Sequence, residues 1–380
     1  MIRYLTAGES HGPALVGILD GLPAGMRIDL AALQGRLAMR QGGYGRGARM
    51  KIEADQAEVF AGLREGLTLG SPVALIIRNR DFENVRSGPP ITRPRPGHAD
   101  YAGALKYRQR DLRNVLERAS ARETAMRVAL GELARQYLGL FGVSVAGYVR
   151  RIGDVEAEFP DGFPDIGDID RSQVRCPDLA VSERMIDRID RAKAEGDTLG
   201  GEFELQAMNV PVGVGSNRQP WDRLDGIIAG ALMSIQTVKA VEIGEGISTS
   251  GYVGSRSHDA FAPDGDAVAR ASNRAGGIEG GMSNGQPLVV RVRVKPIATL
   301  MKPLDSVDLT TGAQAPAAVV RSDICAVPAA SIIGEAMLCL ALAQAFSEKY
   351  GGDSVEEVRE HFEASQRGAA SLFTREPSAP

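Results

Sequence analysis

Two histidines stand in short loops rich in glycine and proline, where an imidazole could move protons. His11 lies in Gly8-Glu9-Ser10-His11-Gly12, between two segments that read as strands. His98 lies in Arg95-Pro96-Gly97-His98, where proline fixes φ and glycine relaxes it, so the loop is irregular and constrained. An accessible imidazole titrates near neutral pH, which makes both candidates for a general acid or base. By itself, the His11 loop fits a hairpin turn with an incidental histidine equally well.

Arginine and lysine are concentrated in two parts of a chain whose formal net charge is -4. From Arg86 to Arg127 there are ten basic and four acidic residues, an excess of six positive charges. The second group surrounds the glycine-rich stretch 41–47 and consists of Arg36, Arg40, Arg46, Arg49 and Lys51. Guanidinium groups fork onto phosphate or carboxylate, so the two groups suit a small polyanion better than nucleic acid. A mobile surface loop is the alternative explanation of the second group.

A helix is expected from about Ser120 to Leu140. Ser120-Ala121-Arg122-Glu123 has the pattern of a capping box, in which Ser120 accepts from the amide of Glu123 and Glu123 reaches back. Apolar residues follow at helical spacing, namely Met126, Leu130, Leu133 and Tyr137. This interpretation puts Arg118 just outside the helix and Arg122 in its first turn, where free amides favour an anion. A plain cap with solvated arginines is the alternative.

Two further motifs could contribute to a site. The glycine cluster 276–285 is neither a Walker loop nor a dinucleotide fingerprint, but its amides could form a nest around an anion. Arg321-Ser322-Asp323 precedes a long apolar segment that is predicted to be helical from about Ala329 to Phe346. The Asp323 carboxylate is either an ordinary cap or a reactive group.

The composition of the 380-residue chain is that of a globular protein, with 43% hydrophobic and 24% charged residues. Three scattered cysteines and four unclustered histidines predict no disulfide framework and no metal site. The N-terminus has no signal-peptide core, and the longest apolar run, near 336–346, is too short to span a bilayer. We expect a cytoplasmic protein with a single domain over 1–366 and a polar, flexible tail over 367–380.

The order of the elements predicts an α+β fold, because many strands follow one another without an intervening helix. Strands are expected at 2–7, 15–19, 58–63, 73–77, 143–149, 200–211, 240–243 and 287–295. Helices are expected at 29–40, 120–140, 182–195, 223–235, 329–346 and 355–366.

Together these motifs resemble the chorismate synthase family over nearly the whole chain. The resemblance is carried by 8–12, 95–100, 118–125, 275–281, Lys295-Pro296 and Arg321-Ser322-Asp323, in that order and spacing. It implies a layered sandwich of two antiparallel sheets flanked by helices, and a homotetramer. The implied reaction is the last step of the shikimate pathway, which leads to the aromatic amino acids. It is an anti 1,4-elimination of phosphate from 5-enolpyruvylshikimate 3-phosphate that gives chorismate, and it requires reduced FMN without net redox change.

The resemblance also implies roles for individual residues. His11 would protonate the departing phosphate, His98 would act on flavin protonation near N1, and Asp323, near flavin N5, would take part in removing the C6 proton. The FMN site would be lined by Arg118, Ala119, Ser120, Gln236, Thr237, Gly280, Lys295, Pro296, Ile297, Ala298, Thr299 and Arg321. The substrate would be gripped by Arg40, Arg46, Arg95 and Arg122, of which the first two are also credited with contact to NADPH.

Two other functions remain open from the residues alone. One is an NADPH-dependent flavin oxidoreductase, although no dinucleotide fingerprint supports it. The other is a non-catalytic protein that binds anions, nucleotides or RNA through its arginines, which a low aromatic content of 5% disfavours. If the chain belongs to the chorismate synthase family, a separate flavin reductase could be its partner, with NADPH as an indirect reductant.

Overall fold

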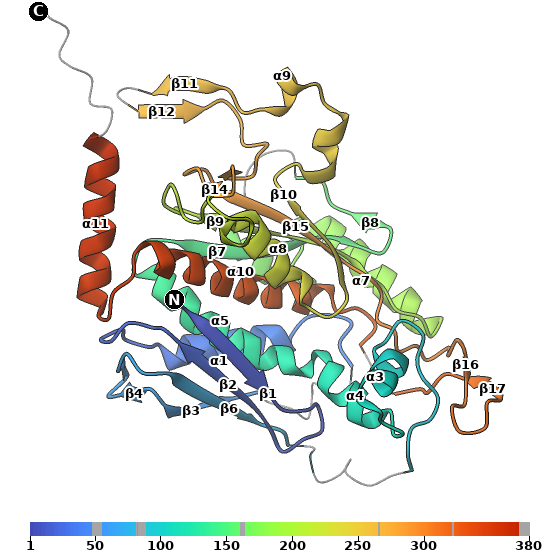
Figure 1. The fold of residues 1–380 in the computed structure, drawn as a ribbon. Helices are drawn as coiled ribbons and strands as arrows, with labels where there is room; N and C mark the ends of the chain where they lie inside the picture. The colour runs from blue at the N-terminus through green and yellow to red at the C-terminus, as the bar shows by residue number, and fades with distance from the viewer. Residues whose placement is uncertain are drawn as a thin grey trace, which may run out of the picture.

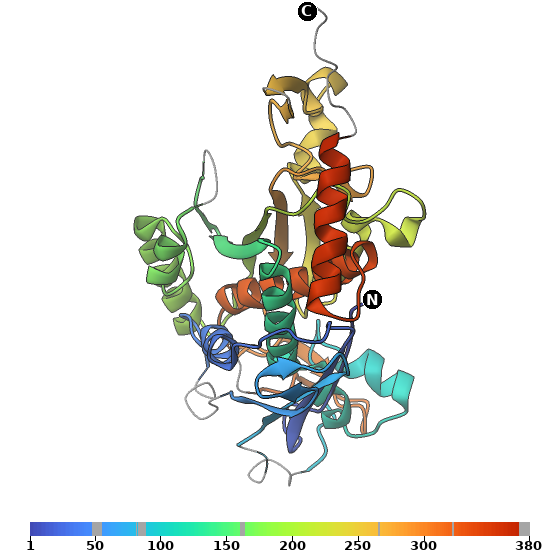
Figure 2. The ribbon, with the colours of Figure 1, turned by 90° about the vertical axis from the view of Figure 1, so that its left-hand side faces the viewer.

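The structure is a computed structural model that describes residues 1–47, 55–80, 82, 89–159, 164–264, 267–320 and 323–371. Two antiparallel sheets form its outer layers, and helices α5 (Thr124–Gly139) and α10 (Val327–Lys349) lie between them (Figure 1 and Figure 2). Buried side chains from both sheets and from these helices form one continuous hydrophobic cluster.

The first sheet positions the His11 loop. Its strand order is β1 (Arg3–Ala7), β2 (Ala14–Asp20), β6 (Val73–Arg78) and β3 (Ala57–Ala61), all antiparallel. Alternate residues of β2 and β6 are buried, as a strand with one covered face requires. The buried face packs on α5, so the β1–β2 loop is held beside the start of that helix.

The second sheet has the order β10 (Val238–Ile243), β15 (Leu288–Val294), β9 (Gly201–Met208), β7 (Ser144–Ile152) and β8 (Val155–Glu156). The predicted alternation of β15 is present: Leu288, Val290, Val292 and Val294 are buried, and Arg291 and Arg293 pair with glutamates of β9 on the other face. Segments that follow β15 and precede β10 reach the same end of the molecule as the His11 loop.

Helix α10 is the centre of the core. It is apolar on all sides and buried over nearly its whole length, which is expected of a helix that contacts neighbours all round. It crosses α5 with the two backbones close together, since a Cβ added to Gly131 would lie 2.5 Å from the Cβ of Ala336. The helix is long and apolar enough to cross a membrane, but 94% of its most apolar window is buried within this protein.

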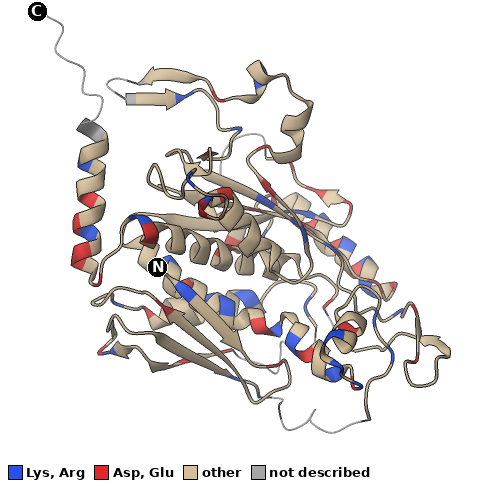
Figure 3. Ribbon diagram, viewed as in Figure 1, with Lys and Arg blue, Asp and Glu red and all other residues tan. Residues whose placement is uncertain are grey.

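The remaining elements surround these layers. The helices are α1 (Leu30–Gln41), α3 (Asp100–Tyr107), α4 (Arg113–Ala119), α6 (Ile166–Arg171), α7 (Leu179–Ala194), α8 (Leu224–Met233), α9 (Gly254–Ser257) and α11 (Val355–Ser371). The two-stranded pairs are β4 (Leu63–Arg64) with β5 (Leu67–Thr68), β11 (Phe261–Asp264) with β12 (Ala267–Arg270), β13 (Ile278–Glu279) with β14 (Met282–Ser283), and β16 (Asp305–Val307) with β17 (Gln314–Pro316). Basic and acidic positions are interspersed over the visible ribbon (Figure 3).

The predicted α+β class with antiparallel sheets is confirmed. The layering differs from the expected sheets flanked by helices, because α5 and α10 are sandwiched between the sheets, where their apolar surfaces are covered on both sides. Helices α3 and α4 were not predicted, since both are too short to show a clear apolar period. Helix α11 runs to Ser371, past the predicted end at 366, and 372–380 lie outside the described residues.

Candidate active site

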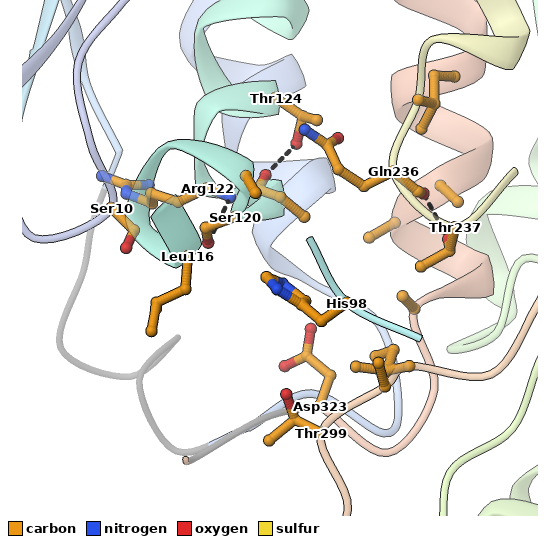
Figure 4. A pocket seen from close by; sticks show the side chains of 18 of the residues that line it. Ser10, His98, Leu116, Ser120, Arg122, Thr124, Gln236, Thr237, Thr299 and Asp323 are labelled. Carbon is orange, nitrogen blue, oxygen red and sulfur yellow. Dashed lines mark hydrogen bonds between the residues drawn. The ribbon is translucent and has the colours of Figure 1, made fainter. Parts of the chain in front are cut away.

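A cavity of about 570 Å³ opens where loops from both sheets meet the first turns of α5 and α10 (Figure 4). It contains all three predicted catalytic residues, His11, His98 and Asp323. The predicted substrate-binding residues Arg40, Arg46, Arg95 and Arg122 also line it. So do Ala119, Ser120, Gln236, Thr237, Lys295, Ile297, Ala298 and Thr299 from the predicted cofactor site.

Three predicted cofactor residues do not line this cavity. Arg118 lies in the last turn of α4, and its guanidinium donates to the backbone carbonyls of Thr6 and Gly8 at 3.1 and 3.2 Å. Arg118 stands two residues before Ser120, the cap of the next helical turn, as predicted, but its guanidinium turns towards β1 rather than towards that helix start. Gly280 forms the tight turn between β13 and β14 with a φ of +60°, and Pro296 lies between two lining residues without facing the cavity. Arg321 lies outside the described residues.

The predicted capping box is also wrong in its contacts. Ser120 Oγ accepts from the amide of Arg122 at 3.3 Å rather than from that of Glu123, because a short 3-10 turn, Ala121–Glu123, precedes α5 (Figure 4). The Glu123 carboxylate instead pairs with Arg127 at 2.6 Å and accepts from Gln236 Nε2 at 3.0 Å. Glu123 thereby connects the start of α5 to the segment that precedes β10.

His98 is oriented by the carboxylate of Asp100, a residue of the 95–100 motif to which no role was assigned. Its Nδ1 lies 2.5 Å from Asp100 Oδ1, and Asp100 is almost fully buried in the first turn of α3. Burial raises the pKa of Asp100, but hydrogen bonds from His98 and Arg95 lower it more, so the net pKa is well below the usual range. An ionised Asp100 accepts a hydrogen bond from Nδ1–H, which leaves Nε2 of His98 as the nitrogen available to a ligand.

Arg95 is committed to the protein rather than open to a ligand. Its Nε and Nη2 donate to the two oxygens of Asp100 at 2.9 and 3.1 Å, and its Nη1 donates to Thr299 Oγ1 at 2.7 Å. The fork geometry of a guanidinium is satisfied by these contacts. In this structure Arg95 therefore fastens the His98 loop to the segment that follows β15.

A buried carboxylate, Asp55, holds two of the predicted substrate arginines. Its oxygens lie 2.5 Å from Arg122 Nη1 and 3.5 Å from Arg40 Nη1. Burial lowers the pKa of Arg40 to about 9; the positive charges of Arg46 and Arg122 act in the same direction, and Asp55 and Asp323 oppose them. Among the described residues, Arg40 Nη1 has no hydrogen-bond partner. An anion in the cavity would relieve both the repulsion and the unmet donor.

Asp323 is held from one side by the glycine-rich loop. Its Oδ2 lies 2.6 Å from Arg46 Nη1, and its Oδ1 accepts from the amide of Gly47 at 2.7 Å. In Figure 4, Asp323 and His98 face the same space, and Ser120 and Arg122 lie across that space from them. Two groups that can exchange protons thus lie in one cavity with several fixed positive charges.

His11 enters the cavity from the β1–β2 loop. Its Nδ1 lies 2.9 Å from Ser10 Oγ and 3.9 Å from Glu117 Oε1. The apolar part of the lining comes from Leu116, Ile235 and the first turns of α10. A cavity with apolar side chains, several cations and three acid–base groups is suited to a polyanion and a flat ring system.

The fold and the site are those of an enzyme, with three acid–base side chains and several cationic side chains gathered in one cavity. The sequence model of a family described as "Chorismate synthase" matches residues 2–347. The chain is 56% identical to a chorismate synthase of Symbiobacterium thermophilum, over 95% of this chain and 97% of that protein. It is 56% identical to one of Desulforudis audaxviator, over 94% and 95%. A crystal structure of a chorismate synthase superposes with a TM-score of 0.80 at 41% identity, covering 98% of this chain and 99% of that chain.

The chain belongs to the chorismate synthase family. It is a lyase, and the reaction predicted from the sequence, formation of chorismate, is that of its family.

Proposed function

We propose that the cavity binds 5-enolpyruvylshikimate 3-phosphate beside reduced FMN, and that His11, His98 and Asp323 carry the proton transfers of the elimination. The observation that carries this proposal is the convergence of these three residues with Arg40, Arg46 and Arg122 on one cavity. The substrate has two carboxylates and a phosphate, and the cavity has a surplus of positive charge to receive them.

The donor set fits FMN as well. The residues that would hold it are Ala119, Ser120, Gln236, Thr237, Lys295, Ile297, Ala298 and Thr299, with the apolar part of the lining available to a ring system. When bound, reduced FMN would supply an electron-rich group that favours expulsion of an anion from the substrate. Arg118, Gly280 and Pro296 belong to this proposal only by resemblance, because none of them is among the residues that line the cavity, and Arg321 belongs to it by resemblance because it lies outside the described residues.

The protein's own groups would act on two bonds of the substrate. Asp323 would accept the proton from C6 once the substrate draws Arg46 away from its carboxylate. His11 would give a proton to the phosphate oxygen as the C3–O bond breaks and a second ring double bond forms. His98, with Nδ1 bound to Asp100, would hold or release a proton at Nε2. General acid or base assistance of this kind typically contributes 10²–10⁴-fold.

Further features of the proposal concern assembly and reduction. A homotetramer is supported by exposed apolar side chains on the outward face of the first sheet, namely Leu5, Val16 and Ile18. A cytoplasmic location is supported by three cysteines that are all buried and free. NADPH contact at Arg40 and Arg46, or a separate flavin reductase, remains a proposal about how the flavin is reduced.

The decisive experiment is an anaerobic assay with chemically reduced FMN and 5-enolpyruvylshikimate 3-phosphate, in which phosphate and chorismate are followed together. Equal release of both, with the flavin still reduced at the end, is expected. A second assay with oxidised FMN and NADPH tests whether the chain reduces its own flavin. Consumption of NADPH in that second assay without phosphate release would instead identify an oxidoreductase.

A further inference from the structure

Asn79 connects the His11 loop to Arg122, one of the arginines that line the cavity. It follows β6, is only 7% exposed and does not line the cavity. Its Nδ2 donates to the carbonyl of Gly12 at 2.7 Å and to that of Glu9 at 3.2 Å, so it holds the loop on both sides of His11. Its backbone amide also donates to Pro13 at 3.0 Å.

The other end of the same amide holds Arg122. Asn79 Oδ1 accepts from Arg122 Nη2 at 2.9 Å and from Nε at 3.1 Å. The two donors and two lone pairs of the amide are therefore all used. The orientation of the amide is determined by this pattern, because exchanging its oxygen and nitrogen would set oxygen against two carbonyls and nitrogen against a guanidinium.

Both partners also have anchors of their own. Arg122 Nη1 donates to Asp55 Oδ1 at 2.5 Å. The His11 loop is also held by the amide of Ser10, which donates to the carbonyl of Glu117 at 3.1 Å, and by Arg118 Nη1, which donates to the carbonyl of Gly8 at 3.2 Å. Asn79 is the single described residue that hydrogen-bonds to both.

We propose that Asn79 is a positioning residue that sets the distance between His11 and Arg122. The inference rests on the proposed function, in which His11 protonates the leaving phosphate and Arg122 helps to hold it. A general acid must lie within hydrogen-bond reach of the oxygen that it protonates. A displacement of about 1 Å in such a group can lower the rate by about 100-fold.

The test is Asn79→Asp, which keeps the size of the side chain and separates its two functions. An aspartate beside Arg122 is ionised, so it still accepts from the guanidinium but donates nothing to the carbonyls of Glu9 and Gly12. The matched control is Asn209→Asp, which removes one donation to the carbonyl of Gly142 on an exposed loop. Asn209 has a φ of +59°, a conformation that aspartate also adopts.

We expect Asn79→Asp to lower kcat by about 100-fold while KM, FMN affinity and the thermal midpoint stay near those of Asn209→Asp. Unchanged kcat would overturn the proposal. A parallel loss of kcat, FMN affinity and thermal midpoint would also overturn it, because that pattern indicates general damage to the fold. Asn79→Ala, which removes both sets of contacts, should raise KM in addition, since Arg122 then loses its two hydrogen bonds to Asn79 as well.

A readout that needs no turnover keeps the inference separate from the proposed function. The chain has four histidines, so the imidazole signals can be resolved by NMR and assigned with His11→Asn. In Asn79→Asp the signal of His11 and its titration midpoint should move, and those of His258 and His361 should not. An unmoved His11 signal would overturn the positioning role. If the wild-type protein formed no chorismate, the proposed function would fail, and this spectrum would still decide the role of Asn79.

Discussion

The guanidinium of Arg46 lies 2.6 Å from the carboxylate of Asp323, although the two residues are 277 positions apart in the chain. The carboxylate proposed as a base is thus neutralised by an arginine proposed to bind substrate. The ion pair and the amide of Gly47 hold this carboxylate in place. An anionic substrate bound at Arg46 would compete with Asp323 for the guanidinium.

The first prediction concerns this ion pair. If the two residues act as a unit, Arg46→Ala and Asp323→Asn should each lower kcat/KM strongly, with about 10²–10⁴-fold for the loss of the base. The double variant should lose much less than the product of the two single effects. Steady-state kinetics of the three variants under anaerobic conditions measures this. Fully multiplicative losses would show that the contact is not part of the mechanism.

The second prediction concerns the dependence of stability on pH. The pKa of Asp100 in the folded protein is lowered, so the unfolded state binds the proton more tightly. The stabilisation from Asp100 is therefore complete above the unfolded pKa, about 3.9, and is lost as the pH falls below it. Urea unfolding between pH 3 and 7 should show a steeper decline for the wild type than for Asp100→Asn. Parallel curves would contradict the assignment.

The third prediction compares two cations of the predicted flavin site. Lys295 lines the cavity and its Nζ donates to the carbonyl of Gly97 at 2.5 Å, whereas Arg118 lies outside it and contacts the first sheet. Lys295→Ala should weaken FMN binding, because it removes a charge from the cavity and loosens the His98 loop. Arg118→Ala should have a smaller effect on the same fluorescence titration. A larger effect of Arg118→Ala would place the FMN phosphate at the end of α4.

The fourth prediction tests the contact between the two central helices. Gly131→Ala would put a methyl group 2.5 Å from Ala336 and should destabilise the fold by about 1–3 kcal/mol despite the better helix propensity of alanine. Gly139→Ala, at the end of the same helix, meets no atom within 4 Å and is the matched control. It should be neutral or stabilising by up to about 1 kcal/mol in denaturant unfolding. Equal stability of the two variants would contradict the close packing.

Much of the local structure could be predicted because it depends on neighbours in the chain. Strand β15 is visible as an alternation of apolar and polar residues, and α10 is visible as a long, nearly continuous apolar run. The loops of His11 and His98 are visible because glycine and proline restrict or free the backbone. The order of these motifs was sufficient to identify the family.

The sequence by itself therefore determined the family, the α+β class and the acid–base and cationic residues that line the cavity. Only the tertiary structure decided which of its arginines are already bound to protein groups. Arg122 contacts Asn79 and Asp55, which are 43 and 67 positions away, and Arg118 turns to strand β1 instead of the cavity. No local pattern encodes such contacts, because a guanidinium has the same propensity whether its partner is a buried carboxylate, a backbone carbonyl or a ligand. The choice is made by long-range packing of the two sheets around α5 and α10.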